Sequence, residues 1–248
     1  MSNLKRILTT ILFIILFWWL VALVVDNPVL PVPGDVFVTF YKLSSRLGVH
    51  IMASFYRIIT GVGISLLIGI PLGLLIGRIK KVDKFAAPLI YLAYPVPKIA
   101  FLPLVLLFLG LGDVSKIFLI SLIVFFQILV HARDAAREIN DELILSVKSL
   151  GATDLQLFWK VVFPASLPRI FTAVRISTGT AIAVLFFTET FATFTGLGYF
   201  IMDAWTRVNY REMFAGITAL SLLGLFLFLF VDIVERLACP WLYLEKNN

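Results

Sequence analysis

Long apolar runs constrain the fold of this chain more than any other feature. An α-helix rises about 1.5 Å per residue, so about 20 apolar residues cross the roughly 30 Å hydrocarbon core of a bilayer. Six runs approach or exceed this length, at residues 4–25, 51–77, 85–109, 117–130, 170–195 and 213–238. The fourth run is short unless it extends to Ser115 or Arg133. The pattern predicts an all-α integral membrane protein with six transmembrane helices.

The composition excludes other broad classes. Hydrophobic residues make up 60% of the chain and charged residues 15%, whereas globular chains carry about 45 to 50% and about 25%. A disordered chain and an ordinary soluble domain are therefore excluded. One cysteine, Cys239, and two histidines far apart in sequence, His50 and His131, offer no set of metal ligands. We expect no metal centre, no disulfide framework and no cofactor.

The distribution of Lys and Arg predicts the orientation in the membrane. Of the 21 such residues, Arg57 and Lys98 lie inside predicted spans. With a cytoplasmic N-terminus, fourteen lie in inside segments and only five in outside segments, namely Lys42, Arg46, Lys116, Arg207 and Arg211. Cytoplasmic loops are enriched in positive charge, so both termini are predicted to be cytoplasmic. The net charge of +6 reflects this topology and indicates no nucleic-acid partner.

Two parts are predicted along the chain. Residues 1–50 hold the first transmembrane helix and an outer segment, and residues 51–248 hold a five-helix core with a cytoplasmic loop at 131–169. No small-residue cleavage site precedes Asp26, so the first helix is expected to be retained. Prolines at 28, 31 and 33 with Gly34 end that helix, and residues 35–47 are predicted to form a short amphipathic helix on the outer surface.

The second span carries a ridge of small residues. Every fourth position is small, at Gly61, Ser65, Gly69, Gly73 and Gly77. Residues at this spacing lie on one helix face and allow a neighbouring backbone to approach closely. The ridge is predicted to be an interface, either with another helix of this chain or with a second subunit or moving gate.

The cytoplasmic loop is predicted to contain two helices. Residues 132–150 are rich in charge at helical spacing and suggest that the fourth helix continues into or beside the cytosol, ending at Gly151. Thr153 or Asp154 can cap a second short helix at 155–163, which Pro164 is expected to stop.

The second loop helix has a narrow polar stripe on an otherwise apolar surface. The stripe contains Thr153, Gln156 and Lys160, and the apolar positions are Leu155, Leu157, Phe158, Trp159, Val161 and Val162. A cytosolic helix this apolar needs a cover. The cover is the chain's own helix ends, the membrane surface or the groove of another protein.

Three charged residues stand out within the predicted spans. A charge in the hydrocarbon costs about 2.5 to 3.5 kcal/mol on insertion scales, so each is a functional candidate. Arg57 and Glu189 lie at similar depth, where they either pair to tie two helices together or line a pathway. Lys98 lies among Pro95, Pro97 and Pro103, which should break the third span. It either attracts an anion or extends toward the headgroups.

The loop resembles the cytoplasmic "EAA" loop of permease subunits of binding-protein-dependent ABC importers. The resemblance is carried by residues 149–153 (SLGAT) and 160–168 (KVVFPASLP). The family pattern is Glu-Ala-Ala, three residues, Gly, nine residues, Ile, one residue and Leu-Pro. Its glycine and final residues are in register with Gly151, Val161, Phe163 and Pro164. Residues 145–147 read Leu-Ser-Val instead of Glu-Ala-Ala, so the acidic residue of the motif is absent.

Shorter fragments extend the resemblance over most of the chain beyond the first helix. They are PVP at 31–33, PVPKIA at 95–100, GLGD at 110–113, TE at 188–189 and GLGY at 196–199. Their order and spacing resemble the nitrate/sulfonate/taurine-type branch of the family. The resemblance implies a type I permease fold in the plasma membrane of a prokaryotic cell.

The resemblance also implies partners and site residues. A second copy of the permease, forming a homodimer, shares one pathway, two ATP-binding cassette subunits dock beneath it, and an extracytoplasmic solute-binding protein delivers the solute. The second loop helix maps to the coupling helix of the family, with contacts expected at Gly151, Ala152, Thr153, Asp154, Gln156, Leu157, Phe158, Trp159, Lys160 and Pro164. The pathway candidates are Arg57, Lys98 and Glu189.

The predicted function is ATP-driven import of a small solute, which is expected to be anionic. The chain has no Gly-x-x-x-x-Gly-Lys-Ser/Thr phosphate cradle, so it is not itself an enzyme and ATP must be hydrolysed by a partner. The first alternative is an ion-coupled secondary transporter, which would act without an ATPase. A membrane-embedded enzyme is disfavoured because the spans offer chiefly Glu189 and no partner base.

Overall fold

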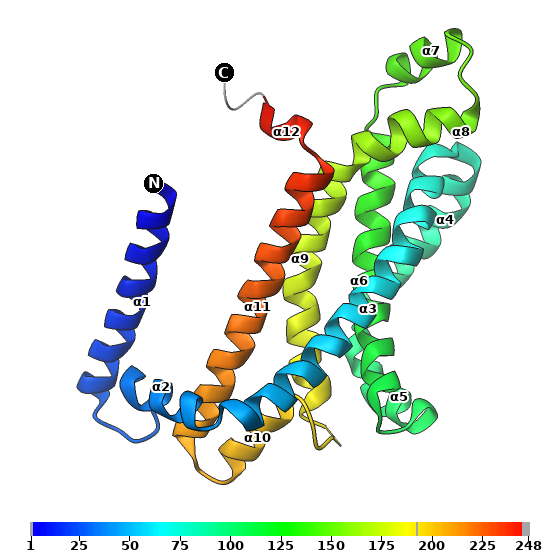
Figure 1. Ribbon diagram of the computed structural model, residues 1–248. Helices are drawn as coiled ribbons and strands as arrows, with labels where there is room; N and C mark the ends of the chain where they lie inside the picture. The colour runs from blue at the N-terminus through cyan, green and yellow to red at the C-terminus, as the bar shows by residue number, and fades with distance from the viewer. Residues whose placement is uncertain (1, 192, 245–248) are drawn as a thin grey trace. The chain divides into compact units, whose positions relative to one another are not determined.

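The computed structural model describes residues 2–191 and 193–244, and every regular element in this part of the chain is helical (Figure 1). This confirms the predicted all-α class. Lys246, one of the residues counted as cytoplasmic above, lies outside the described residues. The elements are α1 (Ser2–Val25), α2 (Pro33–Lys42), α3 (Ser44–Arg78), α4 (Lys80–Ala93), η1 (Lys98–Phe101), α5 (Leu102–Leu109), α6 (Asp113–Arg137), α7 (Asp141–Ser149), α8 (Asp154–Leu157), η2 (Phe158–Val162), α9 (Phe163–Glu189), α10 (Leu197–Thr206), α11 (Tyr210–Ala238) and α12 (Trp241–Leu244).

Four helices in the described part of the chain are long and apolar enough to cross a membrane. They are α3, α6, α11 and the continuous helix Asp154–Glu189. A fifth candidate is the bent pair Lys80–Ala93 and Lys98–Leu109, whose two parts meet at 72°. The apolar helix Thr9–Val25 within α1 is shorter than these. The structure therefore supports four or five spans, and the sixth stays a prediction.

The chain forms two compact units. One contains Met1–Ser54 and Glu189–Leu223, and the other contains Phe55–Thr188 and Gly224–Asn248. The long helices α3 and α11 each contribute residues to both units. The first unit contains α1, α2 and α10. The second contains the bent pair, α6 and the cytoplasmic loop.

The bounds of the segment after α1 differ from the prediction. Residues 35–47 were expected to form one helix, but α2 begins at Pro33, ends at Lys42, and is followed by α3 from Ser44. Proline is favoured in the first turn of a helix, because its missing N–H would have no intrahelical partner there and its φ is already helical. Pro33 thus begins α2 and does not merely end the helix before it.

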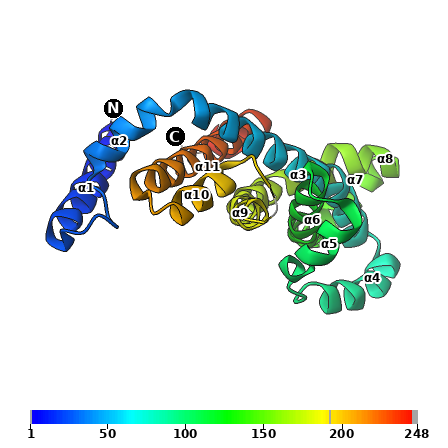
Figure 2. The same ribbon diagram turned by 90° about the horizontal axis from the view of Figure 1, so that it is seen from below.

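The small-residue ridge packs against α6 within the second unit. A Cβ added at Gly61 would lie 2.7 Å from Cγ2 of Ile120, and one at Gly73 would lie 2.6 Å from the carbonyl oxygen of Leu129. Midway between them, the hydroxyl of Ser65 donates to the carbonyl of Ser121 at 2.9 Å. The predicted interface is confirmed, and it is internal to the chain: α3 and α6 lie side by side in both views (Figures 1 and 2).

The fourth predicted run is long enough to span the membrane because it extends at both ends. The helix α6 begins at Asp113 and ends at Arg137, so it includes both Ser115 and Arg133. The expectation that it continues to Leu150 is wrong. Asn140 interrupts the helix by accepting a hydrogen bond from the N–H of Glu142 at 2.8 Å, which caps a separate helix, α7. Short polar side chains favour such caps over helix interiors.

The ridge yields a test of α3–α6 packing. Gly73→Ala is expected to destabilise the protein by about 1 to 3 kcal/mol, because the new methyl group overlaps the α6 backbone. Gly63→Ala, on the same helix with nothing within 4 Å of the added Cβ, is expected to be neutral or mildly stabilising, since alanine is the better helix former. Thermal unfolding of both purified variants measures the difference. Equal unfolding temperatures would contradict the packing described here.

Candidate functional site

The loop predicted to be cytoplasmic begins its second helix with a reciprocal cap. The hydroxyl of Thr153 accepts from the N–H of Gln156 at 3.3 Å, and the Gln156 side chain accepts from the N–H of Thr153 at 2.9 Å. Such a capping box satisfies two backbone donors that a helix start leaves open. Thr153 is therefore the cap, whereas Asp154 pairs with Lys148 of α7 at 2.8 Å. Gly151 enters this turn with φ +84°, a conformation that favours glycine.

Pro164 does not stop the loop helix, contrary to the prediction. Helix α8 passes through the π-helical turn η2 directly into α9, so Asp154–Glu189 is one continuous helix. Just before the proline, the N–H of Phe163 bonds to the carbonyl of Phe158, five residues back. This shift of the hydrogen-bond ladder lets the chain accommodate a residue without an N–H at position 164. Single π turns within α-helices are frequent at functional sites.

Only part of the loop helix is covered by the chain itself. Leu157 and Val162 are buried, with 7% and 2% of their surface exposed. Leu155 and Trp159 remain 69% and 55% exposed. The Trp159 ring lies edge-on to the rings of Phe158 and Phe163, at centroid distances of 5.3 and 5.4 Å. The indole is thereby held in place by aromatic neighbours while much of its surface stays open.

Arg57 binds a partner that the sequence analysis did not find. Its Nη2 and Nε lie 2.7 and 2.8 Å from Oδ1 of Asp113, the first residue of α6. The Arg57 side chain is 3% exposed and that of Asp113 is 50% exposed. The position of Asp113 just before the fourth apolar run was the available signal. Glu189 belongs to the other compact unit, and its pairing with Arg57 stays a prediction.

Glu189 lies at the centre of a hydrogen-bonded cluster in the first unit. The Ser54 hydroxyl oxygen is 2.9 Å from both carboxylate oxygens, and the N–H of Gly198 donates to Oε2 at 2.9 Å. Ser54 also accepts from the N–H of Leu197 at 2.8 Å, and His50 Nδ1 accepts from the N–H of Gly196 at 3.1 Å. The fully buried carboxylate thus holds the start of α10 against α3.

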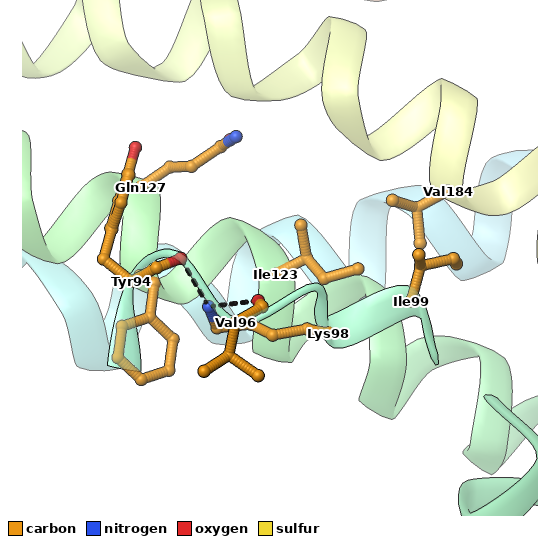
Figure 3. A pocket seen from close by; sticks show the side chains of 8 residues that line it. Tyr94, Val96, Lys98, Ile99, Ile123, Gln127 and Val184 are labelled. Carbon is orange, nitrogen blue, oxygen red and sulfur yellow. Dashed lines mark hydrogen bonds between the residues drawn. The ribbon is translucent and has the colours of Figure 1, made fainter. Parts of the chain in front are cut away.

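Lys98 lies at the predicted break in the third span, which the structure confirms. Helix α4 ends at Ala93 and the chain bends by 72° before α5. The Lys98 ammonium donates to the carbonyls of Tyr94 at 3.2 Å and Val96 at 3.4 Å (Figure 3), and also to that of Ala93 at 2.9 Å. It also lies 4.3 Å from the centre of the Phe126 ring. The ammonium supplies the donors that the prolines at 95 and 97 lack.

Two ion-pair clusters were missed from the sequence. In the second unit, Arg175 of α9 binds Asp232 at 2.6 Å and also Glu235, both on α11. The spacing of Asp232 and Glu235 places them on one face of an apolar helix, which was the signal. In the first unit, Arg207 binds Asp203 at 2.8 Å and Glu212 at 2.7 Å. The hydrogen bonds that Arg207 donates to Glu212 and Asp203 raise its pKa above the usual value.

The long apolar helices, the broken span and the capped cytoplasmic helix are features of a membrane transport component. Residues 69–240 match the family described as "Binding-protein-dependent transport system inner membrane component". The chain belongs to this family and is the permease component of an ABC importer. It is an inner-membrane, multi-pass protein, and ATP is hydrolysed by a partner subunit. This removes the ion-coupled alternative, and the family implies both ATPase and binding-protein partners.

Several relatives match the chain over most of its length. It is 31% identical to the taurine transport system permease protein TauC of Escherichia coli, over 94% of this chain and 88% of that protein. It is 33% identical to the putative aliphatic sulfonates transport permease protein SsuC of Bacillus subtilis, over 88% and 80%. The nitrate import permease protein NrtB of Synechocystis is 29% identical, over 78% and 70%.

A solved structure supports the fold. The MetNI methionine ABC transporter, in an inward-facing conformation, contains a chain that superposes with a TM-score of 0.68 at 19% identity. The match covers 79% of this chain and 98% of that one. At this identity the likeness establishes the permease fold and nothing about the solute.

The Glu189 cluster yields a second test. Ser54→Ala removes a hydrogen bond to a buried carboxylate and leaves the N–H of Leu197 without its acceptor, so we expect a loss of about 2 to 3 kcal/mol in stability. Ser177→Ala is the matched control, because the Ser177 hydroxyl is buried without a hydrogen-bond partner in the described part of the chain. Denaturant or thermal unfolding of the two variants gives the comparison. Similar losses in both would show that the cluster contributes nothing specific.

Proposed function

We propose that this chain is the membrane-spanning subunit of an importer for a small anionic solute of the nitrate, sulfonate or taurine kind. Its relatives TauC, SsuC and NrtB carry these solutes in their names, and each resembles the chain over most of its length. We further propose six spans, with α1 as the first, and both termini in the cytoplasm. The working assembly contains two copies of the chain, two ATPase subunits and one solute-binding protein.

The observation that carries the proposal is the continuity of the loop helix with a membrane span. Leu155 and Trp159 are exposed at the cytoplasmic end of Asp154–Glu189, which runs without a break to the buried carboxylate of Glu189. An α-helix is stiff over this length, so a displacement at its cytoplasmic end is transmitted along it. Closure of an ATPase dimer that grips residues 151–164 would therefore move α9 directly.

Within this proposal, the predicted coupling residues have separate roles. Thr153 and Gln156 hold the start of the helix through their reciprocal hydrogen bonds. Leu157 is buried and attaches the helix to its own chain. Trp159, half-buried Phe158 and exposed Leu155 are then the contacts for the ATPase groove. Buried aromatic residues dominate the energies of such interfaces.

The intramembrane groups complete the proposal. Arg57, Lys98 and Glu189 are proposed to lie along the translocation pathway. Arg57 forms an ion pair with Asp113, whereas Lys98 donates hydrogen bonds only to backbone carbonyls. A cation whose only partners are carbonyl dipoles keeps its net charge and remains able to attract an anion. Lys98 is therefore the pathway residue best suited to an anionic solute.

Co-purification with the ATPase tests the coupling contact. Trp159→Ala is expected to weaken association with the ATPase by at least about tenfold, because an exposed aromatic anchor is lost. Phe108→Ala is the matched control, since Phe108 is 79% exposed on α5, away from the loop. The measurement is the amount of ATPase retained by the tagged permease in detergent, together with solute-stimulated ATP hydrolysis. Unchanged association of Trp159→Ala would remove this residue from the interface.

A backbone variant independently tests whether movement of the loop helix (residues 151–164) drives transport. Gly151→Pro cannot adopt the φ of +84° observed at this turn, because proline fixes φ near −65°. We expect insertion into the membrane to be preserved, since residue 151 lies outside the long apolar helices, and transport to be lost. Solute uptake into cells, compared with the amount of permease in the membrane fraction, measures both. Normal uptake would refute the proposal that the loop helix transmits movement from the ATPase to α9.

A further inference from the structure

The break in the third span borders a pocket of about 290 Å³ in the second unit. Lys98, Tyr94 and Gln127 contribute its polar groups, and Ile99, Ile123 and Val184 are among its apolar walls (Figure 3). Liquid water occupies about 30 Å³ per molecule, so the pocket has room for a solute of fewer than about ten non-hydrogen atoms. Small organic anions are of this size.

The cation of the pocket has no carboxylate partner in the described part of the chain. Lys98 donates only to carbonyl oxygens, and the longest of these contacts, to Val96, is 3.4 Å. The faces of Phe126 and Tyr94, at 4.3 and 5.9 Å, add cation–π attraction without cancelling the charge. An anionic group can replace the weakest carbonyl contact while the other two continue to cap α4.

Gln127 adds a second polar group of a different kind to the pocket. Its Nε2 donates to the hydroxyl of Thr180 on α9 at 3.2 Å, which fixes the orientation of the amide. Its Oε1 is buried and has no hydrogen-bond partner among the described residues. A buried acceptor without a partner is uncommon in native proteins and calls for a functional explanation. A ligand that supplies a donor would satisfy this acceptor.

We propose that this pocket is a solute subsite that recognises two groups at once. The ammonium of Lys98 takes the anionic group, and Oε1 of Gln127 accepts a hydrogen bond from an amino or hydroxyl group elsewhere on the same small molecule. The site therefore prefers an anion that carries a hydrogen-bond donor over one that carries none. The inference rests on the proposed import function and narrows its solute class.

A graded ligand series tests the preference. Taurine, isethionate and ethanesulfonate share the sulfonate and two-carbon chain. At neutral pH they carry an ammonium group, a hydroxyl group and neither, respectively, so the isethionate–ethanesulfonate pair tests the hydrogen bond without a change of charge. Equilibrium binding of each is measured on the purified permease–ATPase complex in lipid nanodiscs, without a binding protein. We expect taurine and isethionate to bind about threefold to tenfold more tightly than ethanesulfonate, the gain from one hydrogen bond.

Two variants test the two groups proposed to recognise the solute, the Lys98 ammonium and Gln127 Oε1. Gln127→Leu is expected to abolish the preference, because it removes the acceptor Oε1, while ethanesulfonate, which offers no donor to Oε1, still binds. The variant also loses the Nε2–Thr180 hydrogen bond, so binding is compared well below its unfolding temperature. Lys98→Met is expected to weaken all three ligands by at least about tenfold, since the charged contact is lost. Lys81→Met, which replaces an exposed lysine in the first turn of α4, is the control and should change nothing.

The outcomes separate this inference from the proposed function. If the complex forms and the three sulfonates bind equally, or none binds at millimolar concentration, the subsite is refuted while the importer assignment stands. A preference that persists in Gln127→Leu likewise refutes the role of Gln127. If the permease does not retain an ATPase at all, the coupling proposal fails instead, and that failure is seen before any ligand is added.

Discussion

Inside a bilayer, every backbone polar group without an intrahelical hydrogen bond needs a partner from the protein, because hydrocarbon supplies none. The contacts of several polar residues in or beside the predicted spans fit this constraint. Lys98 serves the carbonyls exposed at the break after α4. Lys116, assigned to an outside segment, likewise binds the carbonyls of Leu111 and Gly112 where the chain enters α6. Ser54 and Glu189 serve the N–H groups of residues 197 and 198. Charged and polar side chains thus make non-helical segments tolerable in the membrane.

The same side chains connect this structural requirement to transport. Lys98 stabilises the helix break with only neutral acceptors among the described residues, so it places a positive charge at a pocket wall within the predicted third span. The bend after α4 borders the cavity, and Lys98, which caps that bend, supplies the charge. The same structural feature therefore gives the proposed subsite both its shape and its electrostatics. Gln127, oriented by Thr180, adds the directional group. In the second unit, the close contact between α3 and α6 provides a firm support for this arrangement, since small residues let the two backbones meet.

Local patterns succeeded where a single helix or turn decides the outcome. The four-residue repeat of Gly61 to Gly77 predicted an interface, Thr153 was recognised as a possible cap, and the prolines around Lys98 predicted the break. Predictions failed where two local signals compete. Pro164 suggested a helix end, but the π turn at 158–162 shifts the hydrogen-bond ladder and the helix continues. The charge-rich pattern at 132–150 suggested one helix, but the Asn140 side chain caps a new one.

The sequence by itself determined the class of protein, the apolar helices, the charge asymmetry of the loops and the family, because hydrophobicity, helix periodicity and motif spacing are properties of neighbouring residues. Only the tertiary structure decided that the small-residue ridge faces α6, that Arg57 binds Asp113, that Arg175 joins α9 to Asp232 and Glu235, and that Gln127 lines the same pocket as Lys98. These contacts join residues that are distant along the chain. Their partners are chosen by the packing of whole helices, which no local pattern encodes.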